Sequence, residues 1–186
     1  MPRIAPLDLE AAAPDARAAA DAHVRNHARM TNMKRTLLQS LPAFHALMEW
    51  YPLRDVVQPF LGERLTTLFA HAISAETDCL ICSTFFRRML IQTGENPERL
   101  KLDDRETAVL AFGRALAVSP FKVPEEVYRG LTSYFDSGQI VALTAFGAMM
   151  VATNVVNNAL EVELDEYLQP YRKGTRESAT PAGQRT

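Results

Sequence analysis

The stretch AISAETDCLICSTFFRRMLIQTG at residues 72–94 decides the fold. Apolar side chains recur at three- and four-residue steps on both sides of a short polar cluster, which predicts two helices joined by a capped turn. Cys79 and Cys82 open the second helix, and we expect Thr77 or Asp78 to be its N-cap. The stretch therefore predicts a CxxC pair at the start of a helix.

The same spacing predicts helices along most of the chain, and no stretch alternates as a strand does. We expect an all-α fold, a bundle of about seven to eight helices. Pro42 marks either a break or a first turn, Pro52 is expected to end one helix, and Pro59 to interrupt the next. The expected helices are 14–29, 36–51, 53–61, 62–73, 79–92, 103–118, 124–134 and 139–160, with a short coda at 163–171.

Three segments follow from this pattern. Residues 1–30 form a leader and a helix, 31–170 form the helical domain, and 173–186 lack periodicity and are expected to be disordered. The chain is 47% apolar with a net charge of -2, so it lacks the basic footprint of a nucleic-acid binder. No signal peptide is visible, and the uncharged stretch 137–160 carries amides that suit a buried helix. We expect a cytoplasmic protein without a membrane span.

The two cysteines are the whole cysteine content of 186 residues, and they are three positions apart. A disulfide across two residues closes almost no loop, so a structural staple is a poor explanation. In a reducing compartment such a pair indicates redox or metal chemistry. Structural zinc would need two more ligands, and the histidines lack finger-like spacing. Inert buried cysteine remains the third reading. The histidines are His23, His27, His45 and His71.

The first turn of a helix favours thiolate, because its amide groups are unpaired and its dipole is positive. Arg87 and Arg88 add positive potential, while Asp78 opposes it. Residues three apart share a helix face, at a separation that a disulfide can span. One sulfur can attack an oxidised substrate and become a sulfenic acid, and the other can condense with it. An external thiol then restores the pair.

Several other polar residues lie near the pair in sequence. His71 precedes Cys79 by eight positions and is a candidate proton acceptor, although a hydrogen-bonded structural histidine fits equally. Glu63 and Glu76 are further candidate bases. Three asparagines share one face of the last long helix, where they either line a pocket or form hydrogen bonds between helices or subunits, the second being the better default. These are Asn154, Asn157 and Asn158.

These residues resemble the alkylhydroperoxidase D-like (AhpD-like) and carboxymuconolactone decarboxylase superfamily. Besides residues 72–94, the resemblance is carried by LDDRE at 102–106, FGRAL at 112–116 and NVVNNAL at 154–160, and it covers about residues 31–167. It implies an AhpD-like helical bundle that forms homo-oligomers such as trimers, hexamers or dimers. In the peroxidase branch the second cysteine, Cys82, would attack and Cys79 would resolve, with no cofactor and no metal.

That branch also has a proton relay, for which the resemblance points to positions 67 and 86. This chain carries Thr67 and Phe86 there, neither of which can serve. His71 lies one helical turn after position 67 on the same face. We therefore hypothesise that His71 supplies the relay.

The sequence thus favours a thiol-dependent peroxidase or dithiol–disulfide oxidoreductase. Its expected partners are a small-molecule hydroperoxide and an external thiol or dithiol reductant, with no nucleic acid and no membrane. One alternative is a lyase of the carboxymuconolactone decarboxylase branch, which has no need of a cysteine pair. Another is a non-catalytic redox sensor or assembly subunit.

Overall fold

The computed structural model describes residues 1–27, 29–119 and 121–173. This part is all-α, as expected, with nine α-helices, one 3-10 helix and no strand. Most of the expected tail lies outside the described residues. The helices are α1 (Pro14–His27), α2 (Asn32–Leu37), α3 (Leu41–Met48), α4 (Trp50–Leu61), α5 (Glu63–Glu76), α6 (Leu80–Gln92), α7 (Asp104–Ala117), α8 (Glu125–Thr132), α9 (Ser137–Ala159) and the 3-10 helix η1 (Glu166–Tyr171).

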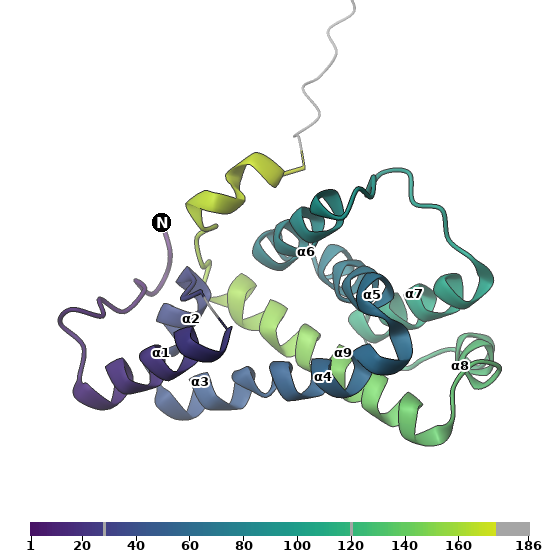
Figure 1. Cartoon of the computed structure of the whole chain (residues 1–186), viewed down its shortest axis with the longest axis horizontal. Helices are drawn as coiled ribbons and strands as arrows, with labels where there is room; N and C mark the ends of the chain where they lie inside the picture. The colour runs from purple at the N-terminus through teal and green to yellow at the C-terminus, as the bar shows by residue number, and fades with distance from the viewer. Residues whose placement is uncertain (28, 120, 174–186) are drawn as a thin grey trace, which may run out of the picture.

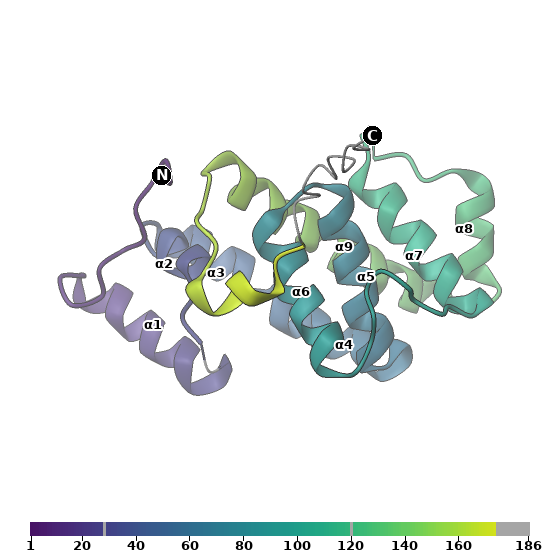
Figure 2. The same cartoon turned by 90° about the horizontal axis from the view of Figure 1, so that it is seen from above.

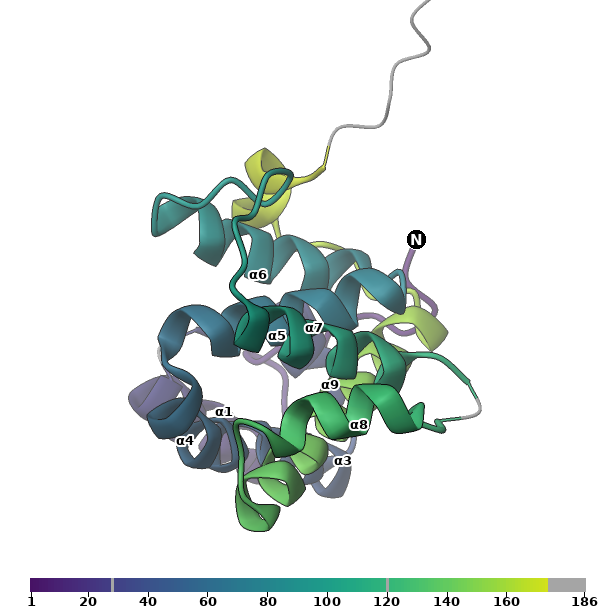
Figure 3. The same ribbon diagram turned by 90° about the vertical axis from the view of Figure 1, so that its right-hand side faces the viewer.

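The long helix α9 runs through the middle of the bundle (Figure 1) and packs against α4, α5 and α7. Helix α5 also packs against α6 and α7. Helices α1 to α3 lie at one end of the molecule, and α7 and α8 at the opposite end (Figure 2). Viewed from the end that carries α7 and α8, helices α6 and η1 lie on one side of the molecule and α3 and α4 on the other (Figure 3). The two sides meet near the N-terminal turn of α6.

Helix α9 is long and apolar enough to cross a membrane by length and composition alone. Its position in the fold explains this apolar composition, because α9 packs against α4, α5 and α7 inside the bundle. The side chains of Leu143, Phe146 and Met150 are fully or almost fully buried. Helix α9 is therefore the core helix of the bundle.

Stacked aromatic rings form the centre of the core. The ring of Phe69 on α5 is stacked 6.4 Å from that of Phe112 on α7 and 6.1 Å from that of Phe146 on α9. Gly113 allows this close approach, since a Cβ there would lie 2.9 Å from the Phe69 ring. Helices α5, α7 and α9 thus pack as one tight unit.

A second, smaller cluster lies under the N-terminal helices. Its buried residues come from α1, α2, α3 and the α2–α3 junction. The first residues of the chain are tied to it by hydrogen bonds: Leu7 N donates to Arg35 O and Arg3 N to Leu160 O, each at 3.0 Å. The buried residues of this cluster are Ala20, Leu37, Leu38 and Phe44.

Three sequence predictions about helix boundaries are wrong. The helix expected at 36–51 is divided into parts of α2, α3 and α4. Pro52 does not end a helix, because it lies in the first turn of α4, where a missing amide proton costs no intrahelical bond. Pro59 lies inside α4, which continues to Leu61. Pro42 does mark a first turn, that of α3.

The turn before α6 is also tighter than expected. Helix α5 continues through Glu76, so this residue is not in a loop. Asp78 takes a left-handed conformation at φ 50°, and Cys79, not Thr77 or Asp78, is the N-cap of α6. The left-handed residue after Thr77 therefore turns the chain sharply, and both cysteines lie at the start of α6.

Candidate functional site

The CxxC turn holds two free thiols at the N-terminus of α6. The backbone is fixed on both sides, since Cys79 N donates to Ser74 O at 3.0 Å and Ser83 N to Cys79 O at 2.9 Å. The side chain of Cys79 has no exposed surface, while Cys82 is 7% exposed. Any molecule that reaches the pair must therefore meet Cys82 first.

The two thiols differ in acidity. The Cys82 thiol donates a hydrogen bond that lowers the pKa of Cys79 to about 7, against the effect of burial and with help from the backbone amides of Cys82 and Ile81 and the side chain of Asn157. The same bond, together with burial and the charge of Cys79, raises the pKa of Cys82 well above its ordinary value. The pair therefore loses one proton readily and holds the other between its two sulfurs.

The asparagines of α9 hold this turn from the other side. Asn157 Nδ2 lies 3.3 Å from Cys82 Sγ and 3.8 Å from Cys79 Sγ, which suits a donor to thiolate. Asn154 Nδ2 donates to Thr77 Oγ1 at 2.8 Å, and Asn158 Nδ2 donates to Thr77 O at 2.9 Å. The expected bonds between helices are confirmed. Sequence reasoning missed that Asn157 touches the sulfurs, although its spacing from Asn154 and Asn158 was the available signal.

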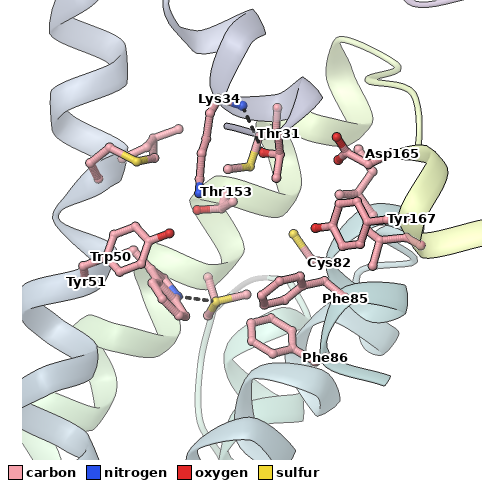
Figure 4. A pocket seen from close by; sticks show the side chains of 16 residues that line it. Thr31, Lys34, Trp50, Tyr51, Cys82, Phe85, Phe86, Thr153, Asp165 and Tyr167 are labelled. Atoms are coloured by element: carbon pink, nitrogen blue, oxygen red, sulfur yellow. Dashed lines mark hydrogen bonds between the residues drawn. The ribbon is translucent and has the colours of Figure 1, made fainter. Parts of the chain in front are cut away.

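Cys82 forms part of the wall of a cavity of about 100 Å³. The lining is mostly apolar and rich in aromatic rings from α4, α6 and η1 (Figure 4). The Trp50 indole closes one side and donates to Met150 Sδ at 2.8 Å. The cavity can therefore hold a small apolar molecule against the Cys82 sulfur. Its aromatic lining consists of Trp50, Tyr51, Phe85, Phe86 and Tyr167.

Neither expected relay position supplies a proton carrier. Phe86 lines the cavity with an apolar ring. Thr67 is buried and donates its hydroxyl to Glu63 O at 2.9 Å within α5. Thiol chemistry at Cys82 must therefore use other groups for its protons.

The structure brings Cys79 and Cys82 together but does not place His71 on the cavity wall. The imidazole on α5 responds to the charges of Arg87 and Glu98 instead. Burial first, and then Arg87, lowers the pKa of His71 to about 4. A neutral imidazole can accept a proton, so a relay role for His71 stays a prediction.

The titratable groups that do line the cavity were missed by sequence reasoning. They come from three separate segments, and no local pattern connects them. Burial lowers the pKa of Lys34 to about 8 and raises that of Tyr51 to about 12. Burial also raises the pKa of Asp165 and of Tyr167. The cavity thus has one buried cationic side chain, that of Lys34, among its lining residues.

Metal ligands do not gather around the pair. Within residues 1–27, 29–119 and 121–173, no group of three or more His, Cys, Asp or Glu side chains could hold an ion. The described part of the chain therefore offers two thiols and an amide as its reactive centre.

Solved structures share this arrangement of helices. The debrominase Bmp8 is 18% identical over 90% of this chain and 95% of its own, with a TM-score of 0.75. A peroxidase-related protein from Ralstonia eutropha JMP134, described as an alkylhydroperoxidase AhpD core, is 18% identical over 90% and 94%, with a TM-score of 0.72. The chain has the AhpD-like fold.

The likeness to these two structures extends over 90% of this chain. An AhpD-related protein of unknown function from Agrobacterium tumefaciens matches only 68% of this chain but 93% of its own, with a TM-score of 0.60 and 17% identity. Bmp8 has also been solved as a cysteine-to-alanine variant in complex with 2,3,4-tribromopyrrole. No protein-family model and no curated protein matches the chain. At these identities the likeness establishes the AhpD-like fold, while chemistry must be argued from the site.

Proposed function

We propose that this AhpD-like protein is a dithiol–disulfide oxidoreductase that reduces a small molecule bound in the aromatic cavity. One observation carries the proposal: Cys82 lies on the cavity wall, while Cys79 is buried behind it, and Asn157 Nδ2 lies 3.3 Å from the first sulfur and 3.8 Å from the second. Cys82 is thus placed to attack, and Cys79 to resolve. The reducing cytoplasm is the compartment that would keep such a pair ready.

The pair can supply its own first proton transfer. The Cys82 thiol lowers the pKa of Cys79, so the two sulfurs share one proton, and a shift of that proton to Cys79 would give a Cys82 thiolate facing the cavity and a Cys79 thiol behind it. The amide of Asn157 stabilises the thiolate at 3.3 Å. This arrangement needs no group at positions 67 and 86.

With a hydroperoxide, the Cys82 thiolate attacks the terminal oxygen and the O–O bond breaks. Cys82 becomes a sulfenic acid, and the alkoxide takes the proton of Cys79 to leave as an alcohol. The Cys79 thiolate then attacks the Cys82 sulfur and releases hydroxide, which combines with the proton that the pair gave up to solvent when its thiolate formed. Two equivalents of an external thiol restore the dithiol and become a disulfide.

Reductive removal of a halogen is the second candidate, favoured by the apolar aromatic cavity and by the likeness to Bmp8. The Cys82 thiolate would take the halogen from a ring carbon, and the resulting carbanion would take the proton of Cys79. Attack of Cys79 on the Cys82 sulfur would then release halide and form the disulfide. The same two electrons leave the dithiol as in hydroperoxide reduction.

The experiment is to treat the reduced protein without air with cumene hydroperoxide or a tribromopyrrole and to follow the thiols by intact mass. We expect wild type to lose the mass of two hydrogen atoms and to turn over when dithiothreitol is supplied. Ser83→Ala is the matched control, because Ser83 is on the same helical turn but outside the cavity lining. Oxidation without turnover would indicate a redox sensor. A dithiol that stays reduced with both compounds would overturn the proposal.

A further inference from the structure

Lys34 on α2 is an unusual residue for the wall of an apolar cavity. It is only 7% exposed, yet it lines the same cavity as Cys82. Its Nζ donates one hydrogen bond, to Arg29 O at 2.8 Å, and lies 5.5 Å from the centre of the Tyr51 ring. In Figure 4 the Lys34 side chain extends across the cavity toward Thr153. A buried ammonium normally requires a partner for its charge.

No carboxylate provides that partner by direct contact in the described part of the chain. Asp165 also lines the cavity, and its charge favours the protonated lysine, but no ion pair joins the two within 4.0 Å. Asp165 Oδ1 instead accepts from Asn32 N at 2.9 Å. The other charged or titratable groups around Lys34 are Arg29, His23, His27, Tyr51 and Tyr167. The lysine therefore keeps a largely uncompensated charge and spare donor capacity.

We propose that Lys34 is an anion subsite, and that the cavity takes a substrate with a flat apolar body and one acidic or anionic group. Such a group, a carboxylate or the anion of an acidic ring hydroxyl or ring N–H, would bind Lys34. The aromatic rings would pack against the body, and the reducible bond would face Cys82. This inference rests on the proposed function, since it names the substrate class of the same cavity.

Different elements supply the sulfur, the charge and the aromatic rings of the cavity. The sulfur comes from α6, the ammonium from α2, and the rings from α4, α6 and η1. Planar rings pack well against Trp50, Phe85 and Tyr167. An anionic aromatic molecule would pack its ring against the apolar lining and bind the single cationic side chain with its charged group. Lys34 would repel a cationic aromatic of the same size, although Asp165 in the same lining would attract it, and a neutral one would lack the charge-assisted bond to Lys34.

Binding can be measured without any redox step. Trp50 is the only tryptophan of the chain and lines the cavity, so its fluorescence reports occupancy. The probes are benzoate, benzyl alcohol and benzylamine, added to the Cys82→Ser protein. We expect benzoate to bind about tenfold more tightly than benzyl alcohol, a difference near the strength of one charge-assisted bond, and benzylamine to bind more weakly than benzoate.

Variants of Lys34 separate binding from structure. Lys34→Met should lose about tenfold in benzoate affinity with benzyl alcohol unchanged, whereas Lys34→Arg should keep the preference for benzoate. Lys122→Met, an exposed lysine far from the cavity lining, is the matched control. Benzoate affinity in the Cys82→Ser protein should also fall as pH rises through about 8, where Lys34 loses its proton, whereas Lys34→Arg in the same protein should show no such fall because arginine stays charged. If Lys34→Met does not fold, Lys34→Arg and the pH profile still decide.

Equal affinity for benzoate and benzyl alcohol in the Cys82→Ser protein would overturn the inference, as would benzoate binding in that protein that does not depend on pH near 8. In that event Lys34 only ties the chain near Arg29 to the core. The redox proposal would survive this result, because it is judged by thiol oxidation. Conversely, clear benzoate selectivity with a dithiol that never oxidises would leave an anion-binding cavity and remove the oxidoreductase.

Discussion

The cavity has two walls of different origin. One wall, from α6 and backed by α5 and α9, carries Cys82 and the asparagines that hold its turn. The other, from α2, α4 and η1, carries Lys34, Tyr51 and Tyr167. The two sulfurs of the first wall come from neighbours in sequence, whereas the second wall is built by segments that meet only in the folded chain. In the proposed function the first wall thus carries the reacting sulfur, and the second carries the proposed anion subsite.

The strongest test of the first wall compares its two sulfurs. Cys82→Ser should abolish thiol-dependent turnover completely, because only Cys82 faces the cavity. Cys79→Ser should also stop turnover but leave an attacking sulfur that accumulates as a sulfenic acid, which dimedone labelling detects by mass.

This comparison decides which cysteine attacks and which one resolves. Labelling of Cys82 in Cys79→Ser, with none of Cys79 in Cys82→Ser, is the expected result. The reverse pattern would make Cys79 the attacking thiol, despite its lack of exposed surface.

The two walls also differ in how far the sequence predicts them. The CxxC pair, the helix after it and the asparagine face were visible because helical periodicity and local spacing determine them. The N-cap was misplaced because the left-handed conformation of Asp78 has no clear local signal in a non-glycine residue. The prediction that Pro52 ends a helix was wrong because proline fits the first turn of a helix as well as it ends one.

The second wall could not be predicted from local patterns. Lys34 is near the N-terminus of the helical domain, while Asp165 and Tyr167 are more than 130 positions away in the chain. These three residues come together because of how α2 and η1 pack across α6 and α9. Packing between segments that are distant in the chain produces no periodic pattern in a single sequence. An isolated lysine in a helix reads as a surface residue until its burial is known.

Stability should depend strongly on the core behind the first wall. In Gly113→Ala the new methyl group would lie 2.9 Å from the ring of fully buried Phe69, so we expect a loss of about 2 kcal/mol in unfolding free energy. Urea unfolding followed by circular dichroism measures it.

Gly130→Ala on α8 is the matched control. Its new methyl group meets only Ala108 Cβ at 3.7 Å, an ordinary contact, and alanine favours helix. We expect this variant to be as stable as wild type or more so. Equal unfolding curves for Gly113→Ala and wild type would show that α5, α7 and α9 are less tightly packed than the contacts imply.

A moderate effect is expected where the first wall meets α9. Asn157 lowers the pKa of both thiols, so Asn157→Ala should shift the pH dependence of thiol oxidation to higher pH. At neutral pH the rate should fall about tenfold, the value of one bond to a charged group. Asn158→Ala is the control, since Asn158 bonds the backbone at Thr77 and not a sulfur. Identical pH profiles for Asn157→Ala and wild type would remove Asn157 from the chemistry.

The smallest effect concerns acid stability near the second wall. Burial lowers the pKa of His23 from 6.5 to about 4, and its Nε2 has no hydrogen-bond partner in the described structure. The unfolded chain therefore binds a proton that the folded chain refuses, and stability falls as pH drops from about 6.5 to about 4. His23→Leu should flatten part of this slope in melting temperature, while exposed His45→Gln should not. Because the pKa of His71, on α5 behind the first wall, is lowered to about 4 as well, and that of His27 is also lowered, some slope must persist in His23→Leu and decrease further when His71 is also replaced. A slope unchanged by either replacement would mean that acid unfolding begins elsewhere, and that neither wall is held together by a neutral histidine.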